Sequence, residues 1–306
     1  LTPKIIVAIC DTEKEKARML GLTLLTRYLQ NTQEPAIIIQ FIQQLILLEK
    51  HPSVYKRMLQ ALQENIQDWI SNIDKNFVFK ILQAKSSILQ EFGFYLLNSD
   101  FDRFALQLTT SEIIQLANHN LFAVREIGRQ LFSQNLNNFR NHTQEMLSAI
   151  KILESKWQDT REYAFTIFTT EFAKSQYTSS VLISICDSTN EEVRKLGLHL
   201  LTQHMQGADI EEYVLKFSEH PSGDMQMFVT NYLETHVANN IEHLRTLVPY
   251  FNSVLSSVNR NGGAKKRILS FLDKEASKSE EAAIVITEII KRQSATMVTR
   301  DKATAI

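Results

Sequence analysis

Apolar residues recur along this chain at intervals of three and four positions, the spacing that keeps them on one face of an α-helix. The segments Ala36–Leu48, Thr143–Leu153, Ile210–Phe217 and Glu281–Lys291 show this spacing. None of them alternates apolar and polar residues as a half-buried strand would. The pattern therefore predicts an all-α fold.

Two distant segments have nearly the same pattern. Ile5–Gln30 reads IIVAICDTEKEKARMLGLTLLTRYLQ and Val181–Gln206 reads VLISICDSTNEEVRKLGLHLLTQHMQ, with nearly half of the aligned positions identical. Both contain Ile-Cys-Asp, a later arginine, Leu-Gly-Leu and Leu-Leu-Thr. Such self-similarity indicates internal repeats.

The residue aligned with Arg18 and Arg194 serves as the anchor of each copy. The anchors are Arg18, Lys56, Gln90, Arg125, Arg161, Arg194, Gln226 and Lys266. Seven positions before the anchor, each copy has an acidic or amide residue: Asp11, Glu49, Gln83, Asn118, Glu154, Asp187, Glu219 and Asn259. Two positions after it, each has an apolar or aromatic residue: Leu20, Met58, Phe92, Ile127, Tyr163, Leu196, Phe228 and Ile268. Six positions after it, the same holds: Leu24, Leu62, Leu96, Leu131, Ile167, Leu200, Tyr232 and Leu272.

The position three residues after the anchor is often glycine. It is occupied by Gly21, Leu59, Gly93, Gly128, Ala164, Gly197, Val229 and Leu269. Glycine inside a helix costs roughly 0.5–1 kcal/mol relative to alanine, so it is expected where two backbones approach closely. We therefore predict that two helices cross at this position.

The anchors are about 32 to 40 residues apart, which is the length of one helical hairpin per copy. A hairpin of this kind buries its apolar stripe only against its neighbours. The sequence predicts an α-solenoid of about eight two-helix repeats over residues 1–293, followed by a cap or linker at 294–306. The absence of a methionine before Leu1 suggests a piece of a longer chain.

An acidic or amide residue, an arginine seven positions later and a small residue in the second helix resemble the HEAT repeat, a relative of the armadillo repeat. The resemblance implies a ladder of acids and arginines between neighbouring repeats. Its members here are Asp11, Asn118, Glu154 and Asp187 with Arg18, Arg125, Arg161 and Arg194. The ladder is expected to be interrupted at Gln90 and Gln226. HEAT arrays serve as scaffolds, transport receptors and regulatory subunits, and in a few branches as DNA-lesion or tetrapyrrole enzymes.

Composition agrees with helices, because glycine (8) and proline (5) are scarce. Lysine plus arginine (33) nearly balances aspartate plus glutamate (34), so the overall charge gives no reason to expect a polyanion or a membrane as partner. No apolar run approaches the roughly 20 residues that span a bilayer, and no secretory signal is present. Two cysteines are too few for a disulfide framework. We expect a cytoplasmic protein.

Residues with catalytic chemistry do not form a recognisable motif, and we expect no catalytic, cofactor or metal site. His199 and His204 are five residues apart, which places them on different faces of a helix. Cys10 and Cys186 occupy equivalent positions and are expected to be buried. The anchor arginines suit phosphate as well as carboxylate, but the acids in the same pattern favour a structural role.

Nucleic-acid binding is the main alternative. Lys265, Lys266 and Arg267 follow Gly262-Gly263 and are a candidate anion site at a helix start. Trp69, Trp157 and Tyr163 are candidates for stacking on a base, although the position of Tyr163 favours the core. The balanced net charge counts against duplex binding, which depends on several lysine and arginine contacts to phosphate.

The second helices are expected to line the concave face of the solenoid and to carry a polar, weakly charged surface. Its candidate partner-binding residues are Thr23, Arg27, Gln130, Thr166, His199, Thr202, Gln203 and Asn231. This surface suits hydrogen bonding to a partner protein or to other domains of the same polypeptide. The leading hypothesis is a non-enzymatic scaffold or adaptor, ahead of a nucleic-acid or DNA-lesion binder and a tetrapyrrole lyase.

Overall fold

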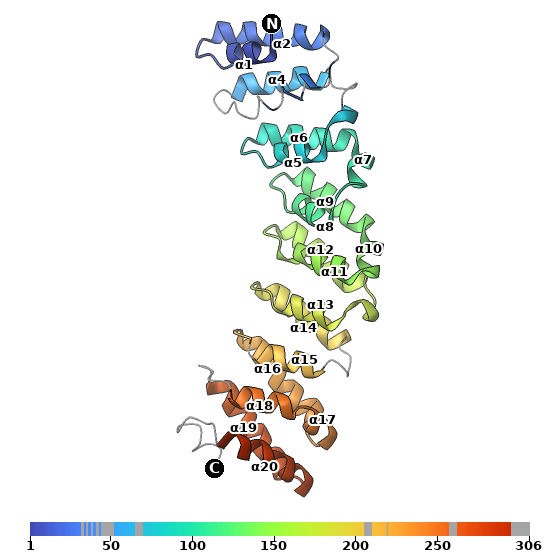
Figure 1. Ribbon diagram of the computed structural model, residues 1–306, viewed down its shortest axis with the longest axis vertical. Helices are drawn as coiled ribbons and strands as arrows, with labels where there is room; N and C mark the ends of the chain where they lie inside the picture. Colours follow the sequence, from blue (N-terminus) through green and yellow to red (C-terminus); the bar gives the residue numbers. More distant parts are fainter. Residues whose placement is uncertain are drawn as a thin grey trace. The chain divides into compact units, whose positions relative to one another are not determined.

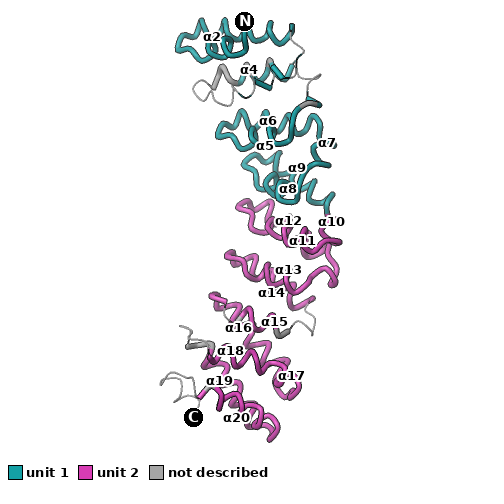
Figure 2. The backbone as a smooth tube through the Cα atoms, viewed as in Figure 1, with its two compact units in different colours: residues 1–135 teal, residues 136–306 magenta. Residues whose placement is uncertain are grey.

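The computed structural model describes residues 1–31, 34, 36, 37, 39, 40, 43, 52–64, 70–204, 210–218, 220–256 and 262–294. Every regular element in this part of the chain is a helix, which confirms the all-α prediction (Figure 1). The helices form two compact units, residues 1–135 and residues 136–306 (Figure 2).

Helices in the first unit pack as consecutive pairs. The elements are α1 (Pro3–Cys10), α2 (Glu15–Asn31), α4 (Pro52–Glu64), a 3-10 turn (Ile70–Asn72), α5 (Lys75–Leu82), α6 (Ser87–Ser99), α7 (Phe101–Ala105), α8 (Thr110–Ala117) and α9 (Phe122–Gln134). Helix α1 packs on α2, α5 on α6 and α8 on α9, and α4 contacts both α2 and α6. The helix expected at Ala36–Leu48 lies largely outside the described residues.

The second unit repeats the arrangement with more short elements. These are α10 (Leu136–Asn141), α11 (Thr143–Ala149), the 3-10 helix η2 (Ile150–Glu154), α12 (Gln158–Thr170), a 3-10 turn (Lys174–Gln176), α13 (Ser179–Cys186), α14 (Glu191–His204), α15 (Ile210–Ser218), α16 (Gly223–Tyr232), the π-helix η5 (Leu233–Val237), α17 (Ile241–Thr246), α18 (Val248–Ser256), α19 (Gly262–Ala276) and α20 (Glu280–Ser294). Helix α13 packs on α14, α15 on α16 and α19 on α20. Of the predicted 294–306 segment, only Ser294 is described, and it ends α20.

Helix α8 shows how local sequence starts these helices. The Thr109 hydroxyl accepts a hydrogen bond from the Glu112 amide, and the Glu112 carboxylate accepts one from the Thr109 amide. This capping box satisfies amide groups that the first turn of a helix leaves without partners. The Lys75 ammonium, at the start of α5, lies 2.9 Å from Glu112 Oε2 and links two neighbouring first helices.

The predicted crossing points are confirmed at four glycines. A Cβ added to Gly128 would lie 2.2 Å from the Ala117 backbone nitrogen, and one added to Gly197 would lie 2.9 Å from that of Cys186. Gly21 and Gly93 approach Cys10 and Leu82 in the same way. Each glycine therefore lets its helix touch the last residue of the helix before it.

A second repeated contact involves the side chain six positions before the anchor. His119 Nδ1 accepts a hydrogen bond from the Leu121 amide while Nε2 lies 2.8 Å from the Leu82 carbonyl, which requires the neutral tautomer with hydrogen on Nε2. His220 repeats this arrangement, accepting from the Ser222 amide with Nε2 3.3 Å from an Asp187 carboxylate oxygen.

Ser188 fills the same position with a hydroxyl. Its oxygen accepts a hydrogen bond from the Asn190 amide, and the hydroxyl donates to the Glu154 carboxylate. In three copies, therefore, one side chain orders its own interhelical loop and also bonds to the preceding helical pair. The residue types differ, so sequence alignment alone does not reveal the shared role.

Burial follows the repeat pattern with one clear exception. Two positions after the anchor, the side chains of Phe92, Ile127, Leu196 and Ile268 are buried. Tyr163 is half-buried, so its predicted place in the core is only partly realised. Leu20 is exposed, contrary to the pattern.

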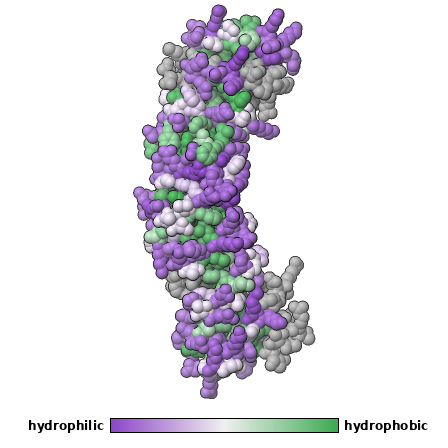
Figure 3. Space-filling view, turned by 180° about the vertical axis from the view of Figure 1, so that it is seen from behind, coloured by the Kyte–Doolittle hydropathy of each residue, from purple (hydrophilic) through white to green (hydrophobic). Residues whose placement is uncertain are grey.

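Leu20 is one of several exposed large apolar residues in the described part of the chain. The face drawn in Figure 3 has apolar patches among hydrophilic residues. The exposed large apolar residues are Leu1, Ile5, Met19, Leu20, Leu106, Phe122, Met227 and Ile284. Isolated apolar side chains are normal on a protein surface, whereas neighbouring ones indicate an interaction site.

Candidate functional site

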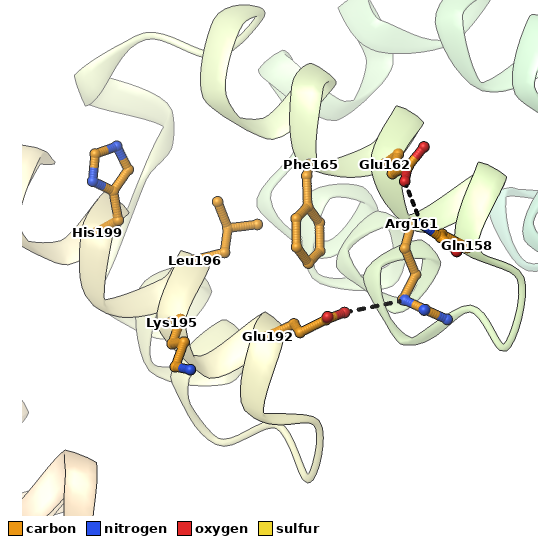
Figure 4. A pocket seen from close by; sticks show the side chains of 8 residues that line it. All are labelled: Gln158, Arg161, Glu162, Phe165, Glu192, Lys195, Leu196 and His199. Carbon is orange, nitrogen blue, oxygen red and sulfur yellow. Dashed lines mark hydrogen bonds and ion pairs between the residues drawn. The ribbon is translucent and has the colours of Figure 1, made fainter.

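A groove with a volume of about 740 Å³ lies between α12 and α14 (Figure 4). Its lining comes from one face of each helix: Gln158, Arg161, Glu162, Phe165, Glu192, Lys195, Leu196 and His199. Within each helix these residues are three or four positions apart, which is why they share a face. Sequence analysis placed only His199 in a binding surface.

The middle of the groove is apolar. Phe165 is half-buried and Leu196 is buried, and both side chains point into the space between the two helices (Figure 4). A site of this size and character suits one or two apolar side chains of a ligand, with polar groups at its edge to orient it.

Charges at the edge of the groove balance. Arg161 Nε lies 3.5 Å from Glu192 Oε2. The two groups form an ion pair, but Nε makes no hydrogen bond. Gln158 Nε2 donates to Glu162 Oε1 at 2.7 Å. Two cations, Arg161 and Lys195, thus face two carboxylates, Glu162 and Glu192. The lining has no excess of positive charge that would select a phosphate backbone.

Lys195 keeps its charge. Its ammonium lies 2.6 Å from the Glu191 carboxylate, one helical turn earlier. This contact raises the pKa of Lys195 and lowers the pKa of Glu191, in each case chiefly through the hydrogen bond between them. A neutral lysine nucleophile is therefore disfavoured at this place.

All eight predicted partner-binding residues are exposed: Thr23, Arg27, Gln130, Thr166, His199, Thr202, Gln203 and Asn231. Thr166 on α12 and Thr202 on α14 flank the helix faces that form the groove. Their hydroxyls donate to carbonyls of their own helices, Glu162 and Leu198 respectively. Each hydroxyl is therefore available to a partner as an acceptor more than as a donor.

Other predicted residues are not part of the groove lining. Thr23 and Arg27 are on α2, Gln130 is on α9 and Asn231 is on α16. Sequence analysis assigned Arg161 and Leu196 to the anchor and the core, and it missed the rest of the lining altogether: Gln158, Glu162, Phe165, Glu192 and Lys195. Their only signal was the helical spacing itself, which every surface helix shares.

The arginine and glutamine anchors have a structural role. Nη1 of Arg18, Arg125 and Arg194 donates to two carbonyls of the loop just before its own helix. Arg161 donates to the Ser155 carbonyl in the same way. Gln90 and Gln226 use Nε2 to reach the corresponding carbonyls of Ala84 and His220, so the pattern continues through both glutamines.

The expected acid ladder differs in its partners. Arg161 pairs with Glu192 and Arg194 with Asp224, which lies 3.3 Å away. Both acids precede the next anchor by two residues. The expected ladder acids have other partners: Glu154 accepts from Ser188, and Asp187 pairs with His220. For Glu154 and Asp187 the expected partners were wrong, because sequence position does not show which way an arginine side chain points.

The three predicted cations Lys265, Lys266 and Arg267 lie near the start of α19. Arg267 Nη2 donates to Gln226 Oε1 at 3.2 Å, whereas Lys266 is exposed and Lys265 is half-buried. They occupy the fourth to sixth positions of α19 rather than its first turn. The candidate anion site at Lys265, Lys266 and Arg267 stays a prediction.

The cysteines and aromatic candidates have structural surroundings. Burial raises the pKa of Cys10 to about 11 and that of Cys186 to about 12, with Asp224 and Asp187 adding to the latter. Both thiols therefore stay protonated at neutral pH and are poor nucleophiles. Trp157 precedes α12 and has the Lys156 ammonium over its ring, while Trp69 lies outside the described residues.

The His204 ring stacks on the Tyr177 ring with centroids 4.6 Å apart, and desolvation lowers the pKa of His204. Among the described residues, no three histidine, cysteine, aspartate or glutamate side chains come close enough to hold a metal ion together. No helix in the same part of the chain is both long and apolar enough to cross a membrane.

Comparison with known proteins identifies no relative: no family model matches the chain, and no curated protein matches it. The structure shows that the described residues form an all-helical protein in which helices pack in pairs.

Proposed function

We propose that this chain is an α-solenoid of about eight HEAT-like two-helix repeats and acts as a non-enzymatic protein-interaction scaffold in the cytoplasm. The repeat assignment is supported by three contacts that recur at the same sequence positions. These are the glycine crossing, the anchor side chain on its own loop, and the bond from the loop to the preceding pair. An array of this kind exposes a row of second helices.

The groove between α12 and α14 is the main support for a binding role. It offers an apolar middle formed by Phe165 and Leu196 and a charge-balanced edge. Such a surface fits an apolar side chain of a partner protein, with its neighbouring main-chain groups near the polar edge. The partner is expected to continue along Thr202 and Gln203, which are exposed on α14.

Affinity capture with matched variants tests this function. Tagged wild-type chain, Phe165→Ala, and Thr202→Glu with Gln203→Glu are used to capture proteins from native lysate. Phe165→Ala and the double variant Thr202→Glu with Gln203→Glu should each lose a partner protein that the wild type retains. Ser184→Glu, an exposed change on the first helix α13, is the control and should capture as the wild type does. Circular dichroism checks that each variant folds.

Nuclease treatment separates the alternative. A protein that remains bound after nuclease and is lost with Phe165→Ala supports the scaffold. Capture that disappears with nuclease, falls steeply with salt and is lost with Lys266→Glu would replace this proposal with nucleic-acid binding. Equal capture by the wild type and all groove variants would remove the groove from the proposal.

A further inference from the structure

His220, in the loop between α15 and α16, makes two contacts that use different nitrogens of its ring. Nδ1 accepts a hydrogen bond from the Ser222 amide at 3.1 Å, and Nε2 lies 3.3 Å from Asp187 Oδ1. An acceptor at Nδ1 and a hydrogen on Nε2 belong to one neutral tautomer of histidine. The contact with Ser222 therefore exists only while the ring is uncharged.

Protonation of the ring removes this acceptor. Because Nε2 already carries a hydrogen, the added proton goes to Nδ1, and the N–H groups of His220 and Ser222 then point at each other. The His220 side chain is buried, so water does not readily take the place of the lost acceptor. A buried N–H without an acceptor costs free energy, so the loop has to move until the Ser222 amide finds another partner.

The protonated ring gains a stronger contact elsewhere. The described titratable and charged groups on the elements around His220 are Cys186 and Asp187 at the end of α13, Arg194 on α14, Lys216 on α15 and Asp224 on α16. Burial raises the pKa of Cys186 to about 12, Arg194 and Asp224 pair with each other, and Lys216 is exposed. Asp187 is the group in contact with the ring, and a positive ring makes that contact a charge-assisted one.

The loop before α14 makes the same two kinds of contact without a titratable ring. Ser188 is six positions before its anchor, as His220 is. Its hydroxyl accepts from the Asn190 amide at 3.0 Å and donates to the Glu154 carboxylate. A hydroxyl oxygen remains an acceptor at neutral and mildly acidic pH. The loop with serine is therefore an internal reference that lacks the response to protonation.

The loop that His220 orders leads directly into α16. Ser222 precedes Gly223, the first residue of that helix, and the Ser222 hydroxyl donates to the Asp224 carboxylate. Asp224 also lies 3.3 Å from Arg194 Nε, which links α16 to α14. A change in the position of Ser222 therefore reaches the contact between two second helices.

We propose that His220 is a pH-sensitive switch in the loop that joins α15 to α16. The uncharged ring holds the Ser222 amide and orders the start of α16. The protonated ring releases this amide and forms an ion pair with Asp187. Histidine ordinarily changes its charge between about pH 5 and pH 8, so the switch responds to mild acidification. It does not rest on the groove between α12 and α14, so this proposal and the proposed function can fail separately.

Nuclear magnetic resonance of the isotope-labelled full chain tests the switch from about pH 8 to about pH 5. The ring nitrogen shifts report the charge of His220, and amide exchange, corrected for its intrinsic pH dependence, reports the bond to Ser222. Protection of the Ser222 amide should fall about two- to tenfold as the ring gains its proton, which is the typical net value of one hydrogen bond. The Asn190 amide is the control in the same molecule and should keep its protection, because Ser188 is its acceptor.

Two variants separate the contacts of the ring. His220→Asn retains an acceptor for the amide two residues later, as asparagine does in an Asx-turn, so Ser222 should be equally protected at both ends of the pH range. Asp187→Asn removes the negative charge beside the ring, so the fall in Ser222 protection should move to lower pH. Circular dichroism at each pH checks that the variants are folded.

A fall in Ser222 protection that follows the charge of His220 and is absent in His220→Asn supports the switch. Constant protection of Ser222 while His220 becomes charged would overturn it. A ring that keeps one charge state over the whole pH range would do the same. An equal fall in the wild type and in His220→Asn would also overturn the proposal, because the acid would then act on another group.

Discussion

Replacing Gly128 by alanine tests the helix crossing at its tightest point. The new Cβ would lie 2.2 Å from the Ala117 nitrogen and 2.6 Å from both the Ala117 Cα and the Leu116 carbonyl carbon. All three are backbone atoms, so no rotamer change relieves the overlap, and α8 and α9 must separate. Overpacking of this kind costs about 1–3 kcal/mol and occasionally more.

An opposing effect makes the prediction sharp. Alanine is a better helix residue than glycine by roughly 0.5–1 kcal/mol, so without a close approach the substitution would stabilise α9. We expect a net loss of about 2–2.5 kcal/mol, because the overlap with backbone puts the packing cost near the top of its range, about 3 kcal/mol, and the helix preference offsets about 0.5–1 kcal/mol of it. The sign of the change therefore decides whether the crossing exists.

The other glycines provide a graded series. Gly197→Ala and Gly21→Ala meet a cysteine sulfur at 2.8 and 2.6 Å and a backbone nitrogen slightly farther away, so smaller losses are expected. Gly93→Ala first meets the flexible end of Leu82 at 3.0 Å and should cost least. Gly223→Ala is the matched control, because it has no neighbour within 4 Å and should be neutral or stabilising.

Urea denaturation followed by circular dichroism measures the series, and hydrogen exchange of α8 and α9 shows where the loss occurs. The two compact units can unfold in separate steps, so each transition is fitted by itself. A Gly128→Ala protein as stable as the wild type, or one less affected than Gly93→Ala, would refute the close approach. Gly197→Leu, a larger intrusion, should cost on the order of 1–3 kcal/mol by the same assay.

Three further predictions use other contacts. Burial acts to raise the pKa of Glu112, but the hydrogen bonds from Thr109 and Lys75 outweigh it and lower the pKa below 4.5. The ionised carboxylate therefore stabilises the folded protein fully above pH 4.5, and this stabilisation is lost as the pH falls through the lowered pKa. Urea melts at decreasing pH should show this loss, and Glu112→Gln should lessen it. Thiol labelling of the wild type should require unfolding, since Cys10 and Cys186 are buried with raised pKa values; fast labelling in native buffer would contradict their placement. Gln90→Leu removes the bond to the Ala84 carbonyl and should cost about 1 kcal/mol in urea melts, whereas Gln90→Arg should largely retain it; equal losses would count against the loop contact.

Much of the fold followed from the sequence because helical periodicity and glycine placement are local signals with direct packing consequences. The helices at Ile210–Phe217 and Glu281–Lys291 lie within α15 and α20. The crossing glycines were predicted from the cost of glycine in a helix, and the structure places each against a neighbouring backbone. The two cysteines were expected in the core and are buried there.

The candidate site was harder to predict because it depends on neighbouring pairs. Phe165 and Glu192 belong to different helical pairs, and nothing in either segment shows that their helix faces meet. The exposure of Leu20 was missed for a related reason. Its local sequence matches that of the buried Leu196, and only the surroundings of the two pairs differ.

Contacts at the anchor position explain how a glutamine can replace an arginine there and still bind the loop before its own helix. An arginine at this position serves two neighbours: Nη1 of Arg194 binds its own loop, while Nε lies 3.3 Å from Asp224 of the next pair. A glutamine keeps the first contact through Nε2. At Gln226 the second contact is reversed, since Oε1 accepts from Arg267 of the following pair. The loop contact is therefore shared by the arginine and glutamine anchors, whereas the link to the next pair occurs with one polarity at Arg194 and with the other at Gln226.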